Sequence, residues 1–142
     1  MCMNSAKKQF NSEEAPAPVG LYPHATKSGN FLFLSGVGPR KKGQTDIPGV
    51  KLKKDGKIST YNIEEQCHSV FKNVKAILED SGSSWEKIID VTVFLTNIED
   101  DFSVFNKIYA EYFKSTQPSR TTVEVNKLPT PIAIELKVIA TI

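Results

Sequence analysis

The chain closes on AIELKVIATI, residues 133–142, and this stretch decides the fold. Its apolar side chains recur every second residue, the period that predicts a β-strand. One face of that strand is apolar throughout and is predicted to meet the core: Ile134, Leu136, Val138, Ala140 and Ile142. The other face mixes polar and apolar groups: Ala133, Glu135, Lys137, Ile139 and Thr141. Such a mixture suits a subunit interface better than open water, so the strand also predicts a homo-oligomer.

Two amphipathic helices are predicted before this strand. The first runs from Asn62, an N-cap with Glu65 three residues later, to the glycine Gly82. Its apolar residues recur at helical spacing: Ile63, Cys67, Val70, Val74, Ile77 and Leu78. Aromatic residues mark the second helix: Phe102, Phe105, Tyr109, Tyr112 and Phe113.

Further strands are predicted on both sides of the helices, at residues 24–27, 31–36, 90–96 and 121–125. Residues 37–60 hold four glycines and two prolines among many lysines, and are predicted to form a loop or a lysine-edged hairpin. Strands that alternate with two helices predict an α+β fold, in which both helices pack on one face of a mixed sheet.

The length of 142 residues predicts one domain over residues 1–142, of which the polar residues 1–14 are expected to form a loose N-terminal tail. The composition, 39% hydrophobic and 24% charged, is that of a globular protein and argues against disorder. The start is polar and no long apolar run follows. A membrane span is therefore excluded and a cytoplasmic location expected. A disulfide between Cys2 and Cys67 is not expected.

The net charge of +2 does not indicate a nucleic-acid partner. The charge is nevertheless uneven. Residues 40–57 hold seven basic and two acidic residues, which sum to +5 and leave −3 for the rest of the chain. No aromatic side chains are interleaved with these lysines, so stacking on single-stranded nucleic acid is not supported. The ordinary interpretation is a solvated edge, and whether this segment reaches a functional site stays open.

Several kinds of chemistry are excluded. The two histidines are His24 and His68, and the neighbours Cys67 and His68 point about 100° apart on a helix, so no metal site is predicted. Ser35 lies outside any G-x-S-x-G motif, which argues against a serine hydrolase. The glycines match no phosphate-binding spacing.

Arginine is scarce in this chain, and its two arginines, Arg40 and Arg120, are candidates for a functional site. Arg120 follows Pro118 at the start of a predicted strand, and Glu135 is the one acid of the last strand. A purely structural role is an open alternative, in which Arg120 and Glu135 form an ion pair with each other or with another chain.

Six motifs in order resemble the reactive intermediate deaminase (RidA/YjgF) family from about residue 15 to the end. They are Gly20-Leu-Tyr22-Pro-His-Ala25, Phe33-Leu-Ser35-Gly36, Val93-Phe-Leu-Thr96, Asp101-Phe102 with Asn106 and Tyr109, Pro118-Ser-Arg120-Thr-Thr-Val123, and Leu128-Pro129 with Ile134-Glu135. The resemblance implies a chorismate-mutase-like α+β fold and a homotrimer with active sites between subunits. It also implies hydrolysis of an enamine or imine to a keto acid and ammonia, without cofactor or metal.

The resemblance assigns roles to individual residues. Arg120 matches the arginine that holds the substrate carboxylate, and Glu135 matches the acid that orders the attacking water. Thr122 lies where many members have a cysteine, so a reactive thiol is not expected. The remaining matches line the same cleft: Tyr22, Ser35, Gly36 and Asn106.

A narrower resemblance is to the 2-aminomuconate deaminases, whose substrate is a six-carbon enamine dicarboxylate. It rests on residues 22–25, the basic residues after Pro39, the insert at 49–52 and the sequence LPTP at 128–131. Arg40 is then the natural partner of the distal carboxylate, although a loop arginine in solvent is an equal alternative. Two other functions stay open: an endoribonuclease or RNA-binding protein, and a non-catalytic trimer that binds metabolites.

Overall fold

The computed structural model describes residues 6–142. Its main sheet has six strands in the order β1 (Lys8–Phe10), β2 (Ala25–Ser28), β3 (Phe31–Leu34), β8 (Ile134–Thr141), β6 (Ile88–Leu95) and β7 (Ser119–Glu124). The pair β6–β7 is parallel and every other neighbouring pair is antiparallel. The C-terminal strand β8 therefore lies inside the sheet, between β3 and β6.

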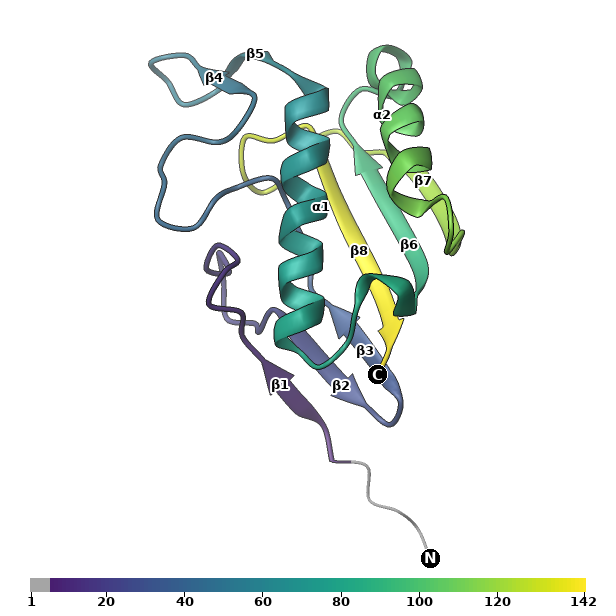
Figure 1. The fold of residues 1–142 in the computed structure, drawn as a ribbon. Coiled ribbons are helices and arrows are strands. Elements are labelled where there is room, and N and C mark those ends of the chain that lie inside the picture. The colour runs from purple at the N-terminus through teal and green to yellow at the C-terminus, as the bar shows by residue number, and fades with distance from the viewer. Residues whose placement is uncertain (1–5) are drawn as a thin grey trace, which may run out of the picture.

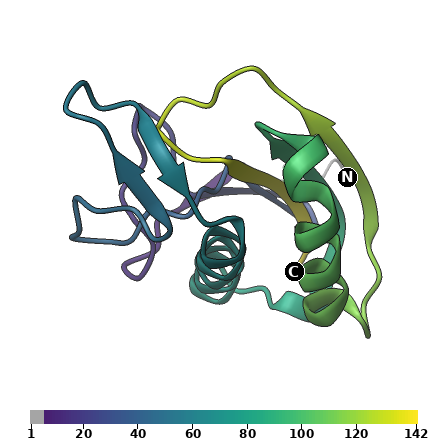
Figure 2. The ribbon, with the colours of Figure 1, turned by 90° about the horizontal axis from the view of Figure 1, so that it is seen from above.

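Two helices, α1 (Ile63–Asp80) and α2 (Ile98–Phe113), pack on one face of this sheet. Figure 2 shows them side by side beneath the curved sheet, and the short 3₁₀ turn η1 (Trp85–Lys87) leads from α1 into β6. Aromatic rings fill the space between the helices, with Phe71 of α1 in contact with Tyr109 and Phe113 of α2. The predicted α+β fold with a mixed sheet and two helices on one face is confirmed.

The alternation is confirmed within β8, but the prediction that Ile142 meets the core is wrong, because Ile142 follows the end of the strand and is 38% exposed. Ile134, Leu136, Val138 and Ala140 are fully buried under the helices, whereas Glu135, Lys137, Ile139 and Thr141 are partly exposed on the opposite face. Ala133 differs from the expectation because it is buried. It precedes the strand, and its backbone N–H donates to Gln66 Oε1 at 2.8 Å.

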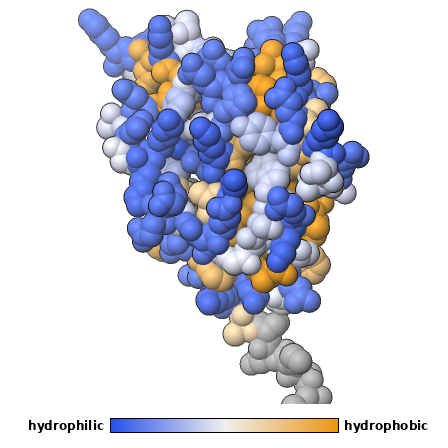
Figure 3. All heavy atoms as spheres, in the orientation of Figure 1, coloured by the Kyte–Doolittle hydropathy of each residue, from blue (hydrophilic) through white to orange (hydrophobic). Residues whose placement is uncertain are grey.

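The sheet face without helices carries exposed apolar side chains in the described part of the chain. Phe31 and Phe33 of β3 are 46% and 38% exposed, and Val123 of β7 is 37% exposed. Cross-strand pairing places Phe33 beside Ile139. Further along the sheet, Val123 pairs with Phe94, and Phe94 pairs in turn with Glu135, so these three side chains lie on the same face. The helix side, in contrast, is largely hydrophilic in Figure 3.

Both helix starts are capped by asparagine. Asn62 Oδ1 accepts the N–H of Glu65 at 3.0 Å, as predicted. The second helix begins earlier than its aromatic pattern indicates, at Ile98, because Asn97 Oδ1 accepts the N–H of Asp100 at 3.0 Å. Its first turn is acidic and contributes no aromatic residue to the pattern.

The expectation of a loose tail over residues 1–14 is wrong for residues 6–14, the part of the tail that the structure describes. Strand β1 pairs with β2 in the register Phe10↔Ala25. Ser12 is buried, and its hydroxyl donates to Asp80 Oδ2 at 2.5 Å. Residues 1–5, including Cys2, lie outside the described residues. A three-residue strand is too short to show a period, so the sequence did not predict it.

The segment 37–60 forms, together with Tyr61, the second, two-stranded sheet, in which β4 (Val50–Leu52) pairs with β5 (Ile58–Tyr61). Of the two alternatives for this segment, the lysine-edged hairpin is confirmed, and it projects beside the start of α1 in Figure 1. Tyr61 anchors the hairpin to α2, because its hydroxyl donates to the buried Asp101 carboxylate at 2.6 Å. Among residues 6–142, no helix has the length and apolarity needed to cross a membrane.

Candidate active site

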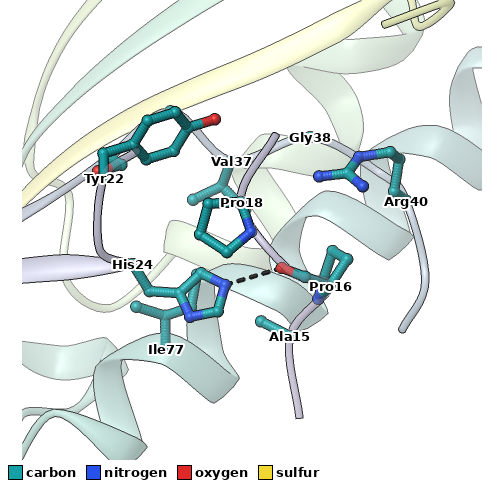
Figure 4. A pocket seen from close by; sticks show the side chains of 11 residues that line it. Ala15, Pro16, Pro18, Tyr22, His24, Val37, Gly38, Arg40 and Ile77 are labelled. Carbon is teal, nitrogen blue, oxygen red and sulfur yellow. Dashed lines mark hydrogen bonds between the residues drawn. The ribbon is translucent and has the colours of Figure 1, made fainter. Parts of the chain in front are cut away.

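Two adjoining cavities lie at the end of the sheet where β8 begins, and they share Tyr22, Gly36, Gly38 and Arg40 in their walls. The first cavity lies under the segment that contains Pro16 and Pro18, and Figure 4 shows Tyr22 and Arg40 on either side of Pro18 there. The second cavity continues to the loop 129–132 and to Glu135. Together they form a cleft, which we call the Glu135 cleft.

Glu135 enters this cleft from the sheet face that carries no helix. Its carboxyl group is half-buried, and this burial raises its pKa above the usual value. Gly36 makes the position possible, because a Cβ atom on Gly36 would lie 2.2 Å from Glu135 Oε1. The glycine therefore lets a carboxylate lie directly against the backbone of the chain that follows β3.

Ser35 lies in the wall of the first cavity, beside Gly36. Its hydroxyl donates to the backbone oxygen of Pro23 at 2.7 Å, and its N–H donates to the oxygen of His24 at 3.0 Å. In this chain Ser35 thus holds the segment between Tyr22 and β2 against the end of β3.

His24 fixes another wall of the cleft, which sequence reasoning did not foresee. Its Nδ1 accepts the N–H of Ser12 at 2.8 Å, so the ring proton lies on Nε2 and points to the oxygen of Pro16 at 2.7 Å (Figure 4). The pair of bonds ties the N-terminal segment over the cavity. A lone histidine in a sequence gives no signal of such partners.

Arg120 is placed elsewhere, on the helix face of β7. Its guanidinium lies over the ring of Tyr109, with 4.6 Å from Cζ to the ring centroid, and donates to Asn106 Oδ1 at 2.9 Å. Asn106 projects from α2, so this helix and β7 together position the guanidinium. The aromatic rings below hold its planar group without neutralising its charge.

Strand register shows that Arg120 and Glu135 lie on opposite faces of the sheet. Arg120 pairs with Val91 of β6, whose side chain is buried under the helices. Glu135 pairs with Phe94, three residues further along β6 and hence on the other face. The alternative of an ion pair between Arg120 and Glu135 within one chain is therefore wrong.

The predicted site residues thus fall into two groups. Tyr22, Ser35, Gly36, Arg40 and Glu135 meet at the Glu135 cleft. The second group contains Arg120, Asn106 and Thr122. Thr122 shares the helix face of β7 with Arg120, and its buried hydroxyl has no hydrogen-bond partner among residues 6–142. Nowhere in residues 6–142 do three or more acidic, histidine or cysteine side chains form a cluster that could hold a metal ion.

The fold and the six sequence motifs together indicate the RidA/YjgF class of proteins, and comparison with known proteins agrees with this class. Residues 12–142 match the family model described as Endoribonuclease L-PSP. A RutC family protein of Pyrococcus horikoshii is 40% identical over 94% of this chain and 97% of its own length. Reactive Intermediate Deaminase A, chloroplastic, of Arabidopsis thaliana is 36% identical over 98% of this chain and 68% of its own.

A solved structure shares the whole architecture. The crystal structure of Escherichia coli TdcF with bound serine superposes with a TM-score of 0.80 at 30% identity, covering 95% of this chain and 98% of that one. The chain belongs to the RidA/YjgF family.

Proposed function

We propose that this protein is a cofactor-independent deaminase that hydrolyses a carboxylate-bearing enamine or imine to the keto acid and ammonia. The observation that carries the proposal is the half-buried carboxyl group of Glu135, which faces an open cleft beside Gly36. The name of the Arabidopsis relative supports the reaction class. Serine bound to TdcF supports a small carboxylate-bearing ligand.

Glu135 acts as the base in this proposal. Once the imine nitrogen is protonated, its carbon is electrophilic, so the protein needs only to position a water and remove its proton. The carboxylate of Glu135 accepts that proton while the water oxygen bonds to carbon. The resulting carbinolamine takes the proton back on nitrogen. Its C–N bond then breaks while Glu135 removes the proton of the new hydroxyl group, so that the keto acid and ammonia leave and this last proton converts ammonia to ammonium. The reaction consumes one water and needs neither an oxidant nor a metal.

Arg120 binds the substrate carboxylate that stands next to the imine. A guanidinium presents parallel N–H donors that match the two carboxylate oxygens and thereby fix the distance from the imine carbon to the water. Asn106 and the ring of Tyr109 hold this group in one orientation. Tyr22, Ser35, Gly36 and Thr122 are proposed to line the remaining space.

Because Arg120 and Glu135 lie on opposite sheet faces, the complete site needs two copies of the chain. The exposed apolar face with Phe31, Phe33 and Val123 supports association through the sheet. We propose a homotrimer with three such sites, each combining the Glu135 cleft of one subunit with Arg120 of the next.

The substrate is proposed to be either a short 2-imino acid or 2-aminomuconate. Both carry a carboxylate next to the reacting carbon, and they differ in whether a second carboxylate is present at the far end. The choice therefore depends on whether the cleft has a second cationic group.

The test generates 2-iminobutyrate with an amino-acid oxidase in the presence of semicarbazide, which traps the imine. A deaminase is expected to lower the semicarbazone yield and to raise the rate of 2-oxobutyrate and ammonia release in proportion to its concentration. Glu135→Gln is the matched control, since it keeps the shape of the side chain and removes the base. A yield unaffected by the native protein would refute the proposal. In that case, salt-dependent binding or cleavage of single-stranded RNA tests the endoribonuclease alternative.

A further inference from the structure

We infer that Lys137 is a positioning residue of the Glu135 cleft, and that its ammonium group holds the bulged segment 34–36 against the carboxylate of Glu135. This inference rests on the proposed deaminase function and adds a residue to its site. Lys137 itself does not touch the substrate. It acts by fixing the backbone against which Glu135 lies.

A β-bulge lies between the end of β3 and the residues that continue it into the cleft. Phe33 pairs with Ile139, and the next antiparallel pair between the two segments joins Val37 to Leu136. Between these pairs, the three residues of the segment 34–36 lie opposite only two residues of β8. The bulged segment supplies part of the wall of the Glu135 cleft. The shape of the cleft therefore depends on how this bulge is held.

The side chain of Lys137 takes the place of a backbone donor at the bulge. Leu34 has no register partner on β8, and its backbone oxygen accepts a hydrogen bond from Nζ of Lys137 instead. The lysine side chain is half-buried, and this burial lowers the pKa of Lys137. An ammonium group in such surroundings is destabilising unless a polar partner compensates for the lost water, and the Leu34 oxygen is that partner.

Lys137 and Glu135 contact the same bulge from the same strand. One position separates them in β8, so both side chains lie on the sheet face without helices. Lys137 binds the first residue of the segment 34–36, and Glu135 lies against its last residue, Gly36. Among residues 6–142, no ion pair joins the two groups. The position of Gly36 against the Glu135 carboxylate therefore depends on the bond at Leu34.

The other bonds of the bulge hold it to β2 or continue the ladder beyond it. Ser35 donates its backbone N–H to the oxygen of His24 at 3.0 Å, on the side of β2. Val37 resumes the ladder with β8 through two backbone bonds of 2.8 and 2.9 Å. Within residues 6–142, the bond from Lys137 is the side-chain hydrogen bond that joins the segment 34–36 to β8.

The experiment replaces Lys137 by methionine, which keeps the length of the side chain but has no donor for the Leu34 oxygen. Without that bond, the segment 34–36 is expected to move away from Glu135 and to admit water to its carboxylate. Lys137→Met is therefore expected to lower kcat for 2-iminobutyrate about 10-fold, with a smaller change in KM. Lys137→Arg keeps a charged donor and is expected to restore most of this loss. Native turnover by Lys137→Met, or equal losses in both variants, would overturn the inference.

The pKa of Glu135 distinguishes a positioning role from a direct effect of the lysine charge. Access of water lowers the pKa of Glu135 toward the usual value of 4.5, whereas loss of a nearby positive charge raises it. The carboxyl signal of Glu135 is titrated by carbon-13 NMR in the protein without substrate, and Glu135→Gln assigns it. A lower pKa in Lys137→Met than in the native protein is expected. An equal or higher pKa would overturn the inference.

The matched control is Lys87→Met, which removes an exposed lysine next to the start of β6, whereas the residue that pairs with Glu135 lies near the end of this strand. It is expected to leave kcat, KM and the pKa of Glu135 unchanged, and changes as large as those of Lys137→Met would overturn the inference. Light scattering checks the assembly of each variant, since Lys137 lies on the proposed subunit interface. Where Lys137→Met does not assemble, Lys137→Ala, which also lacks a donor, is measured with the same expectations.

The titration needs no turnover, so it separates this inference from the proposed function. If no imine is hydrolysed but the pKa of Glu135 falls in Lys137→Met and not in Lys137→Arg, the deaminase proposal fails and the positioning role stands. If imines are hydrolysed and Lys137→Met changes neither kcat nor this pKa, only the positioning role fails.

Discussion

Glu135 combines two properties that a general base needs, a partly dry surrounding and an open approach for water. Burial raises its pKa, and Gly36 keeps the space at its Oε1 free. In the proposed mechanism the ionised form is active, so activity falls as the pH falls through this raised pKa. The acid limb of the kcat/KM profile is therefore expected above the usual carboxyl value of 4.5.

Replacing Glu135 by glutamine tests this role directly. Because the base is lost and the shape is kept, kcat is expected to fall about 10²–10⁴-fold with a smaller change in KM, and the acid limb should vanish. Steady-state kinetics from pH 4 to 9 measure both effects. Full turnover by Glu135→Gln would assign water activation to another residue.

Arg120 has a different task, which depends on the shape of its side chain as well as on its charge. Arg120→Lys replaces a planar fork by a point charge and also loses the stacking on Tyr109. We expect a loss of about 1.5–3 kcal/mol, or 10–150-fold in kcat/KM. Kinetics with 2-iminobutyrate measure it, and equal activity of the lysine variant would show that charge alone suffices.

At the scale of elements, α1 has both a structural and a site-building role. Its buried apolar face packs on β8, while Ser69 and Asn73 hold the backbone of residues 38–40. The pair β7 and α2 does the same for Arg120. Each half of the proposed site is therefore positioned by one helix that faces the sheet.

The start of α1 offers a measurable contribution to stability. Asn62 Oδ1 satisfies the N–H of Glu65, and alanine cannot replace that acceptor. Asn62→Ala is expected to lower the free energy of unfolding by about 1 kcal/mol, measured by urea denaturation at fixed protein concentration. Asn126→Ala, an exposed asparagine outside any helix, is the control and should be neutral. Equal effects of both variants would contradict a capping role.

At the scale of the whole molecule, the opposite placement of Arg120 and Glu135 makes activity a property of the assembly. Light scattering is expected to give about three times the chain mass of 15.8 kDa. An active, stable monomer would contradict the proposed site.

Mixing two inactive variants provides a sharper test of shared sites. Arg120→Ala and Glu135→Gln are unfolded together in equal amounts and refolded as mixed trimers. A site is intact when it takes Arg120 from one variant and Glu135 from the other, which random assembly achieves in about one site in four. About a quarter of native activity is therefore expected. Refolding each variant alone is the control, and no recovery in the mixture would place both residues in one subunit's site.

Much of the fold follows from the sequence because side-chain periodicity is a local property of the backbone. The period of two at residues 133–142 and the period of 3.6 after Asn62 are set by strand and helix geometry, whatever lies next to them. The apolar and mixed faces of β8, the first helix and the α+β class were predicted for this reason. The six motifs likewise indicated the family without any contact being known.

Tertiary structure alone decided which faces and segments meet. Strand β7 reads SRTTVE, whose side chains show no contrast between two faces, so only its register with β6 places Arg120 on the helix side. The bonds from Ser69 and Asn73 that fix the backbone at Arg40 span 30 to 35 residues of sequence. The strand at Lys8–Phe10 likewise exists because β2 pairs with it. These features depend on pairing between distant segments, which no local pattern encodes.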